Sequence, residues 1–241
     1  MIQMLKSLIL YSKIFRHLTL HSKIAIISTI GFIFIGAILI FILEFSNPLT
    51  IGNMSLFGKI QASFFQSVTT RTAGFVSVPQ ENLTNASAVV SIILMLIGGS
   101  PVGTAGGIKT VTVAVLFCST VATIRNKNSA TLFGRRISEN SIKKAVAVVA
   151  TFAAICVTST VLIMATHEAS ALDVLYETVS ATATVGLTRN LTSGLNSFGK
   201  IVIIATMYFG RVGPISLAVA FGSKSESQNL ISEPTEEISI G

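Results

Sequence analysis

The stretch GGSPVGTAGGIKT, residues 98–110, comes within one residue of a phosphate-binding loop. Such a loop follows the pattern G-x-x-x-x-G-K-[S/T], whose backbone N–H groups hold the phosphates of a nucleotide. Counting back from Lys109, Gly103 is in place, but Ile108 stands where the second glycine belongs. Nucleotide-hydrolysing enzymes also need a carboxylate for Mg²⁺, and the only aspartate, Asp173, is placed by the charge pattern at the opposite membrane face. The sequence therefore indicates no enzyme, and no catalytic residue is assigned.

The glycines of this stretch have another use in a chain that lies in lipid. Of its 241 residues, 51% are hydrophobic and only 11% are charged, and the mean hydropathy is +0.75. Soluble domains carry about 25% charged residues, so these values indicate an all-α integral membrane protein. The uncharged runs 24–43 and 145–165 are long enough to cross about 30 Å of hydrocarbon, and 198–221 is a third apolar run. Segment 86–123 contains the glycine-rich stretch and is too long for one straight span, so we expect a broken helix.

Basic residues collect in two segments that flank the apolar runs. The positive-inside rule places the N-terminal segment 1–22 and the linker 125–144 in the cytoplasm. The tail 223–241 then ends on the same side, so we expect a multi-pass protein of the cell membrane with both termini cytoplasmic. The net charge of +7 reflects this topology, with the lipid bilayer as partner and no nucleic acid. The two cysteines and three histidines show no metal-ligand spacing, so neither a metal site nor a cofactor is expected.

An internal repeat organises the chain. FFQSVTTRTAGF (64–75) aligns with LYETVSATATVGL (175–187), which pairs an aromatic residue, an amide or acid, a hydroxyl and a valine in turn. Each aligned segment contains a glycine, Gly74 in the first and Gly186 in the second. A further glycine follows 24 residues later in both cases, at Gly98 and at Gly210. Apolar sequences align easily by chance, but the equal glycine spacing favours true repetition.

Each repeat, 23–124 and 145–222, is expected to consist of a span, a short pore helix, a turn and a second span. The short helices 57–68 and 171–180 are too brief to cross a bilayer. They are expected to dip in from outside and to return through extended backbone, which is tolerated at that depth only inside protein or beside a watery cavity.

The turns 69–75 and 182–187 are rich in hydroxyls and small side chains. Backbone carbonyls from such turns replace the water shell of a cation, and the C-terminal end of each short helix adds a negative dipole end. A simple packing turn between helices is the alternative. The candidate selectivity-filter residues are Thr70, Thr72, Ala73, Gly74, Thr182, Thr184, Val185 and Gly186.

Three motifs in order, SVTTRTAGF, IGGSPVGTAGGIKT and YFGRVGPISLA, resemble the Trk/Ktr/HKT superfamily of potassium transporters, and most of all its Ktr-type membrane subunits. The resemblance runs from about His21 to Phe221. Members have four such repeats around one pore, and this chain resembles the third and fourth, the C-terminal half. The resemblance implies uptake of K⁺, often stimulated by Na⁺. It also implies a dimeric membrane subunit on a cytosolic ring of nucleotide-binding regulatory subunits.

The same resemblance implies that the glycine-rich stretch is an intramembrane loop beneath the filter, which blocks or opens the pore. A static kink is the alternative. The candidate gate-loop residues are Gly98, Gly99, Ser100, Gly103, Thr104, Gly106 and Gly107.

Two arginines accompany the filter and the loop. An arginine in the middle of a span costs about 2.5–3.5 kcal/mol on insertion scales, so it needs a cavity or a polar partner. We expect Arg211 to bind loop carbonyls and to add an electrostatic barrier to cations. Arg71 is expected to support the first turn through Glu177 or Glu81, the alternative being a charge that reaches the outer surface.

Two functions remain open from the sequence. The first is a cation-conducting subunit, completed either by a second copy as a homodimer or by another polypeptide that carries the first two repeats. The second is a truncated, non-transporting membrane fragment or scaffold that requires this other half.

Overall fold

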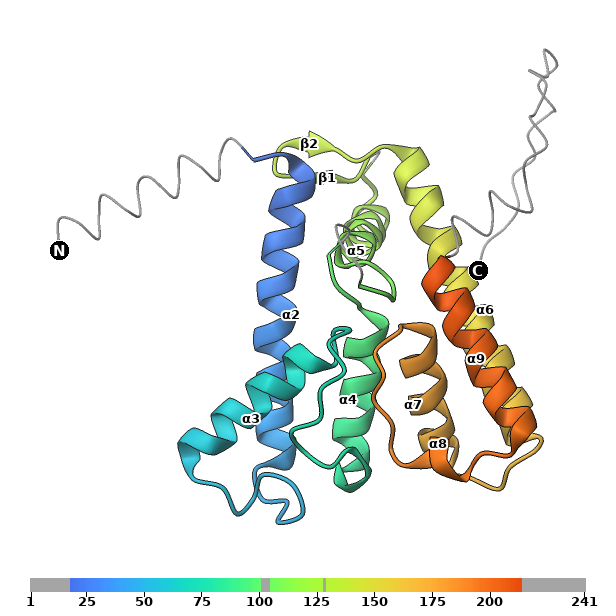
Figure 1. The fold of residues 1–241 in the computed structure, drawn as a ribbon. Coiled ribbons are helices and arrows are strands. Elements are labelled where there is room, and N and C mark those ends of the chain that lie inside the picture. The colour runs from blue at the N-terminus through green and yellow to red at the C-terminus, as the bar shows by residue number, and fades with distance from the viewer. Residues whose placement is uncertain (1–17, 101–104, 128, 214–241) are drawn as a thin grey trace.

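The computed structural model describes residues 18–100, 105–127 and 129–213 (Figure 1). Gly103 and Thr104 of the expected gate loop lie outside these ranges, as do residues 1–17 and the tail 223–241.

The described chain is mostly helical, as the composition predicts. Side-chain oxygens cap several helix starts, for example Thr19, Thr84 and Asn196, each of which accepts from a backbone N–H in the first turn. The elements are α2 (Leu20–Glu44), α3 (Leu56–Thr69), η1 (Gln80–Asn82), α4 (Asn85–Leu96), α5 (Thr110–Ile124), β1 (Thr131–Leu132), β2 (Arg135–Arg136), α6 (Glu139–Met164), α7 (Ala171–Thr182), α8 (Leu191–Gly194) and α9 (Ser197–Val212).

Two helices in the described ranges, α2 with 25 residues and α6 with 26, are long and apolar enough to cross a membrane. By itself such a pair is weak evidence for a membrane protein. The helices α4 and α5 have 12 and 15 residues and are separated by the glycine-rich stretch. The third expected span, 198–221, is described only as far as residue 213, and its helix α9 has 16 residues.

The helices form two similar sets in chain order, α2–α3–α4 and α6–α7–α9. In Figure 1 the short helices α3 and α7 lie on either side of α4. Ser67 of α3 donates to the carbonyl of Ile33 in α2 at 2.8 Å, and Thr178 of α7 shares a 2.9 Å hydrogen bond with Thr160 in α6. Ser67 and Thr178 are the aligned hydroxyls of the two segments. Each short helix is thus tied at the same point to the long helix that precedes it.

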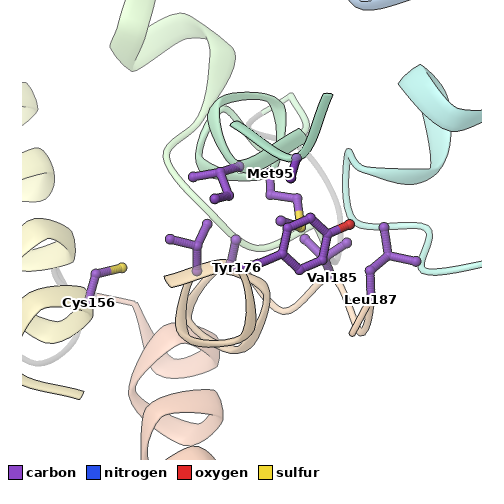
Figure 2. Close-up of a cluster of buried hydrophobic side chains, with 9 residues drawn as sticks. Met95, Cys156, Tyr176, Val185 and Leu187 are labelled. Carbon is purple, nitrogen blue, oxygen red and sulfur yellow. The ribbon is translucent and has the colours of Figure 1, made fainter. Parts of the chain in front are cut away.

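Among the described residues, the largest cluster of buried hydrophobic side chains joins the two sets, because α4 packs against α7 there. Met95 and Tyr176 are fully buried, and Val185 and Leu187 from the segment after α7 pack with them (Figure 2). This core lies directly behind the second turn.

A small hairpin departs from the all-α expectation. Strands β1 and β2 pair antiparallel within the basic linker, at the end of the molecule away from α7 (Figure 1). Phe133 and Gly134 between them have positive φ, 50° and 74°, the geometry of a two-residue hairpin turn.

Candidate ion-conduction site

The first turn leaves the C-terminal end of α3 and is closed by hydrogen bonds. The N–H groups of Ala73 and Gly74 donate to the carbonyl of Thr69 at 3.2 and 3.1 Å, and the Thr69 hydroxyl donates to the carbonyl of Phe75 at 2.6 Å. Thr72 and Gly74 have positive φ, 66° and 75°, with one residue of negative φ between them.

The second turn has the same alternation after α7. Thr184 and Gly186 have φ of 54° and 90° and are again separated by one residue. When residues of positive and negative φ alternate, successive backbone N–H groups point to one side of the chain. The carbonyl groups then point to the other side. The two turns thus share a backbone suited to carbonyl ligands.

The two turns touch through their backbones. A Cβ atom on Gly74 would fall on the carbonyl oxygen of Val185, and it would lie 3.9 Å from the Cα of Gly186. Only glycine fits at position 74, for this reason and because of its positive φ.

Two other predicted filter residues, Thr70 and Thr182, lie at the helix ends and are fully buried. The Thr70 hydroxyl donates to the carbonyl of Ser67 at 3.0 Å, and that of Thr182 to the carbonyl of Thr178 at 2.7 Å. These hydroxyls therefore stabilise the short helices.

The glycine-rich stretch lies against the second turn. A Cβ on Gly106 would fall on the Thr184 hydroxyl and on the carbonyl of Ala183. The two ends of the stretch meet in a parallel bridge between Ile97 and Ile108.

Further hydrogen bonds close the base of this loop. The N–H of Ile108 donates to the carbonyl of Leu96 at 2.9 Å, and that of Thr110 to the carbonyl of Gly99 at 3.3 Å. The ammonium group of Lys109 donates to the carbonyl of Ala105, so the lysine that suggested a phosphate site holds the loop instead.

Arg71 does not contact the partners that we expected from the sequence. Its guanidinium donates to the carbonyl of Thr29 in α2 at 3.0 Å and to that of Gly98 at 3.2 Å. The side chain extends from the first turn toward α2 and the loop, and the predicted support by Glu177 or Glu81 is wrong.

The Glu177 carboxylate has other partners. It is buried at 6% exposure and accepts hydrogen bonds from the hydroxyls of Thr188, at 2.6 Å, and Thr192. Glu177 thus braces the chain that follows the second turn. The repeat alignment pairs Glu177 with Gln66, so both segments have a hydrogen-bonding side chain at this position. That shared polar position was the sequence feature from which the bracing role of Glu177 could have been predicted.

Arg211 lies in the last turn of α9, near the second turn and the loop. A Cβ on Gly210 would fall on the carbonyl of Thr182, so α9 touches the end of α7 there. The positive charge of Arg211 also acts on that of Lys109 at the end of the loop. Binding of Arg211 to loop carbonyls stays a prediction.

Two buried charges outside the turns escaped the sequence analysis. Glu44, fully buried at the end of α2, accepts hydrogen bonds from the side chains of Asn47 and Thr50 and from the N–H and hydroxyl of Thr84, at 2.6–2.9 Å. Arg189 forms a 2.7 Å ion pair with Asp173. A lone acid directly after a long uncharged run was the available signal for Glu44.

Comparison with known proteins identifies the family. Residues 2–233 match the model of the TrkH family, which is described as "Cation transport protein". The chain belongs to the TrkH family. The family expected from the motifs is confirmed, and it is a family of membrane cation transporters rather than of enzymes.

Among TrkH-family relatives, the chain is 38% identical over 231 residues to the Ktr system potassium uptake protein B of Vibrio alginolyticus, covering 96% of this chain and 50% of the relative. It is 33% identical over 231 residues to the potassium/sodium uptake protein NtpJ of Enterococcus hirae, covering 94% and 51%. The potassium transporter TrkH from Vibrio parahaemolyticus shares the fold, with a TM-score of 0.69 and 18% identity, over 80% of this chain and 43% of that one. The chain spans about half the length of the relatives it matches.

Proposed function

We propose that the chain conducts K⁺ across the cell membrane as one half of a TrkH-family pore, and that the two turns line this half. The observation that carries the proposal is the backbone contact between the turns, in which Gly74 lies against the carbonyl of Val185. Both turns alternate left-handed and right-handed residues and follow the negative ends of short helices. The proposed ligands are the carbonyls of Thr70, Thr72, Ala73, Gly74, Thr182, Thr184, Val185 and Gly186.

We propose further that the glycine-rich loop is the gate. Its contact with the second turn through Gly106 supports this role, as does its attachment to the first turn through Arg71. Arg211, close to the end of the loop, would raise the barrier to cations while the loop is in place. The proposed gate residues within the described ranges are Gly98, Gly99, Ser100, Gly106 and Gly107.

A pore of four repeats needs two more than this chain carries. We propose that they come from a second copy or from another polypeptide, and that the basic hairpin end faces the cytoplasm, where a nucleotide-binding regulatory ring would dock. Coupling to Na⁺ is part of the proposal because one relative is named for potassium and sodium uptake.

Uptake of K⁺ by a transport-deficient host tests the function. The chain is expressed alone and together with the first half of a TrkH-family relative, and growth at low K⁺ and ⁸⁶Rb⁺ influx are measured. We expect influx in one of these arrangements, and we expect Gly186→Ala to abolish it because φ there is 90°. Gly194→Ala is the matched control, since that glycine has ordinary φ and open space around it.

A membrane-inserted chain that gives no influx in either arrangement would contradict the proposal. That result would favour the scaffold function instead.

A further inference from the structure

Three buried side chains connect the two repeats behind the turns, and we call them the amide–phenol cluster. They are Gln66 of α3, Gln80 of η1 and Tyr176 of α7, each at most 1% exposed. The two amides pair reciprocally, with Gln66 Nε2 donating to Gln80 Oε1 at 2.6 Å and Gln80 Nε2 donating to Gln66 Oε1 at 3.1 Å. The Tyr176 hydroxyl donates to Gln80 Oε1 at 2.9 Å.

The orientation of the Gln80 amide is determined by a fourth bond. Its Nε2 also donates to the carbonyl of Val78 at 2.5 Å, and a carbonyl only accepts. Both amide hydrogens and both lone pairs of Gln80 are therefore used. This leaves the Gln80 oxygen to accept from Tyr176, so the phenol must be the donor.

The cluster joins parts of the chain that carry both turns. Gln66 lies one helical turn before the end of α3, and Gln80 follows the first turn. Tyr176 lies 96 residues beyond Gln80 in sequence, and its ring packs with Val185 and Leu187 of the second turn and its continuation. Figure 2 shows this ring among Met95, Val185 and Leu187, with its hydroxyl pointing away from α7.

A buried polar network costs desolvation that an apolar core would avoid, and what it adds is a unique geometry. A hydrophobic contact at this point would allow the repeats to slide, whereas the short, directional bonds of Gln80 do not. The cluster thereby holds the turns at the separation at which Gly74 lies against the carbonyl of Val185.

We propose that the amide–phenol cluster sets the separation of the two turns and thereby the size of cation that they accept. Gln80 and Tyr176 are then positioning residues that never touch the ion. This inference rests on the proposed function, in which the turns line the pore.

Tyr176→Phe is the sharpest test, because it removes one hydroxyl and keeps the ring that packs behind the second turn. Tyr208→Phe is the matched control, since Tyr208 is 65% exposed on α9. The full chain is used in the arrangement that takes up ⁸⁶Rb⁺, and competition by Na⁺ and K⁺ for uptake is measured. We expect discrimination between K⁺ and Na⁺ to fall about fivefold in Tyr176→Phe, the factor for one neutral hydrogen bond, with the maximal rate kept.

Hydrogen exchange followed by mass spectrometry on the purified chain is a second measurement that needs no transport. In Tyr176→Phe the amides of residues 71–83, which belong to the other repeat, should exchange about fivefold faster, while those of α6 stay unchanged. Tyr208→Phe should alter neither reading.

Unchanged exchange at 71–83, or faster exchange with unchanged ion discrimination, would overturn the inference. Absence of uptake by the unaltered chain in every arrangement would contradict the proposed function instead. The exchange measurement would then still decide whether the cluster holds the first turn.

Discussion

Replacement of Arg71 measures how firmly the first turn is tied to the loop. The guanidinium donates to two carbonyls, those of Thr29 and Gly98, and lies 6.0 Å from the centre of the Phe32 ring. Hydrogen bonds from charged groups contribute about 1.5–3 kcal/mol each. Because Arg71 is only partly buried, water screens the charge, and we use the lower end of that range.

Two variants separate the charge from the geometry. In Arg71→Lys the charge remains, but one shorter ammonium group reaches only one of the two carbonyls. Only the bond to Gly98 ties the turn to the loop, since Thr29 lies in α2, so the lysine should lose less than about 1.5 kcal/mol, or less than about tenfold in the equilibrium that frees the loop. Arg71→Met loses the bond to Gly98 entirely, about 1.5 kcal/mol, which corresponds to about tenfold in the same equilibrium.

Hydrogen exchange at the base of the loop is the assay. The N–H groups of Ile108 and Thr110 donate to the carbonyls of Leu96 and Gly99, and they become exposed when the loop leaves. Their exchange should be faster in Arg71→Lys than in the wild type, and faster still in Arg71→Met. Arg135→Lys, in the exposed hairpin, should leave it unchanged. Equal exchange in wild type and Arg71→Met would refute the tether, and equal acceleration in both Arg71 variants would refute the expectation that a lysine keeps part of the bond to Gly98.

Three further substitutions test other contacts. Gly106→Ala drives a methyl group into the second turn at Thr184, so we expect a loss of about 1–3 kcal/mol in thermal unfolding and altered ⁸⁶Rb⁺ influx. Glu44→Gln replaces a carboxylate oxygen by an NH₂ group that faces hydrogen-bond donors. Some of these donors, such as the backbone N–H of Thr84, cannot accept instead, so the free energy of unfolding should fall by about 1–3 kcal/mol in the same measurement. Glu177→Gln should cost less than about 1 kcal/mol there, because both of its donors are hydroxyls that can rotate to accept instead.

Each of these has a control. Gly31→Ala enters open space in α2, and Glu139→Gln changes a carboxylate that is 76% exposed. A Gly106→Ala chain as stable and active as Gly31→Ala would exclude the close approach of loop and turn. A Glu177→Gln chain less stable than Glu44→Gln would contradict the argument from donor type.

The mostly helical fold could be predicted from the apolar composition of the sequence. Within the described residues, α4 ends at Leu96 and α5 begins at Thr110, on either side of the glycine-rich stretch. Gly74 and Gly186, which the repeat alignment pairs, both adopt positive φ, which most other residues avoid.

The hydrogen-bond partners of polar side chains could not be predicted from local sequence features. Gln80 and Tyr176 are 96 residues apart, and no periodicity brings them together. Arg71 was assigned to acids by charge alone, yet the structure gives it backbone carbonyls. Backbone carbonyls also accept hydrogen bonds from a guanidinium, and they leave no mark in the sequence. The hairpin was missed because its turn, Phe133 and Gly134, lies within a segment identified only by charge.

The loop between α4 and α5 is held at its start by one repeat and at its end by the other. Gly98 and Ser100 bind Arg71 and Thr29 of the first repeat, while Gly106 lies on the second turn. A rotation of one set of helices relative to the other would change the distance between these contacts. The loop would therefore respond to movement of either set through contacts that it already makes with both.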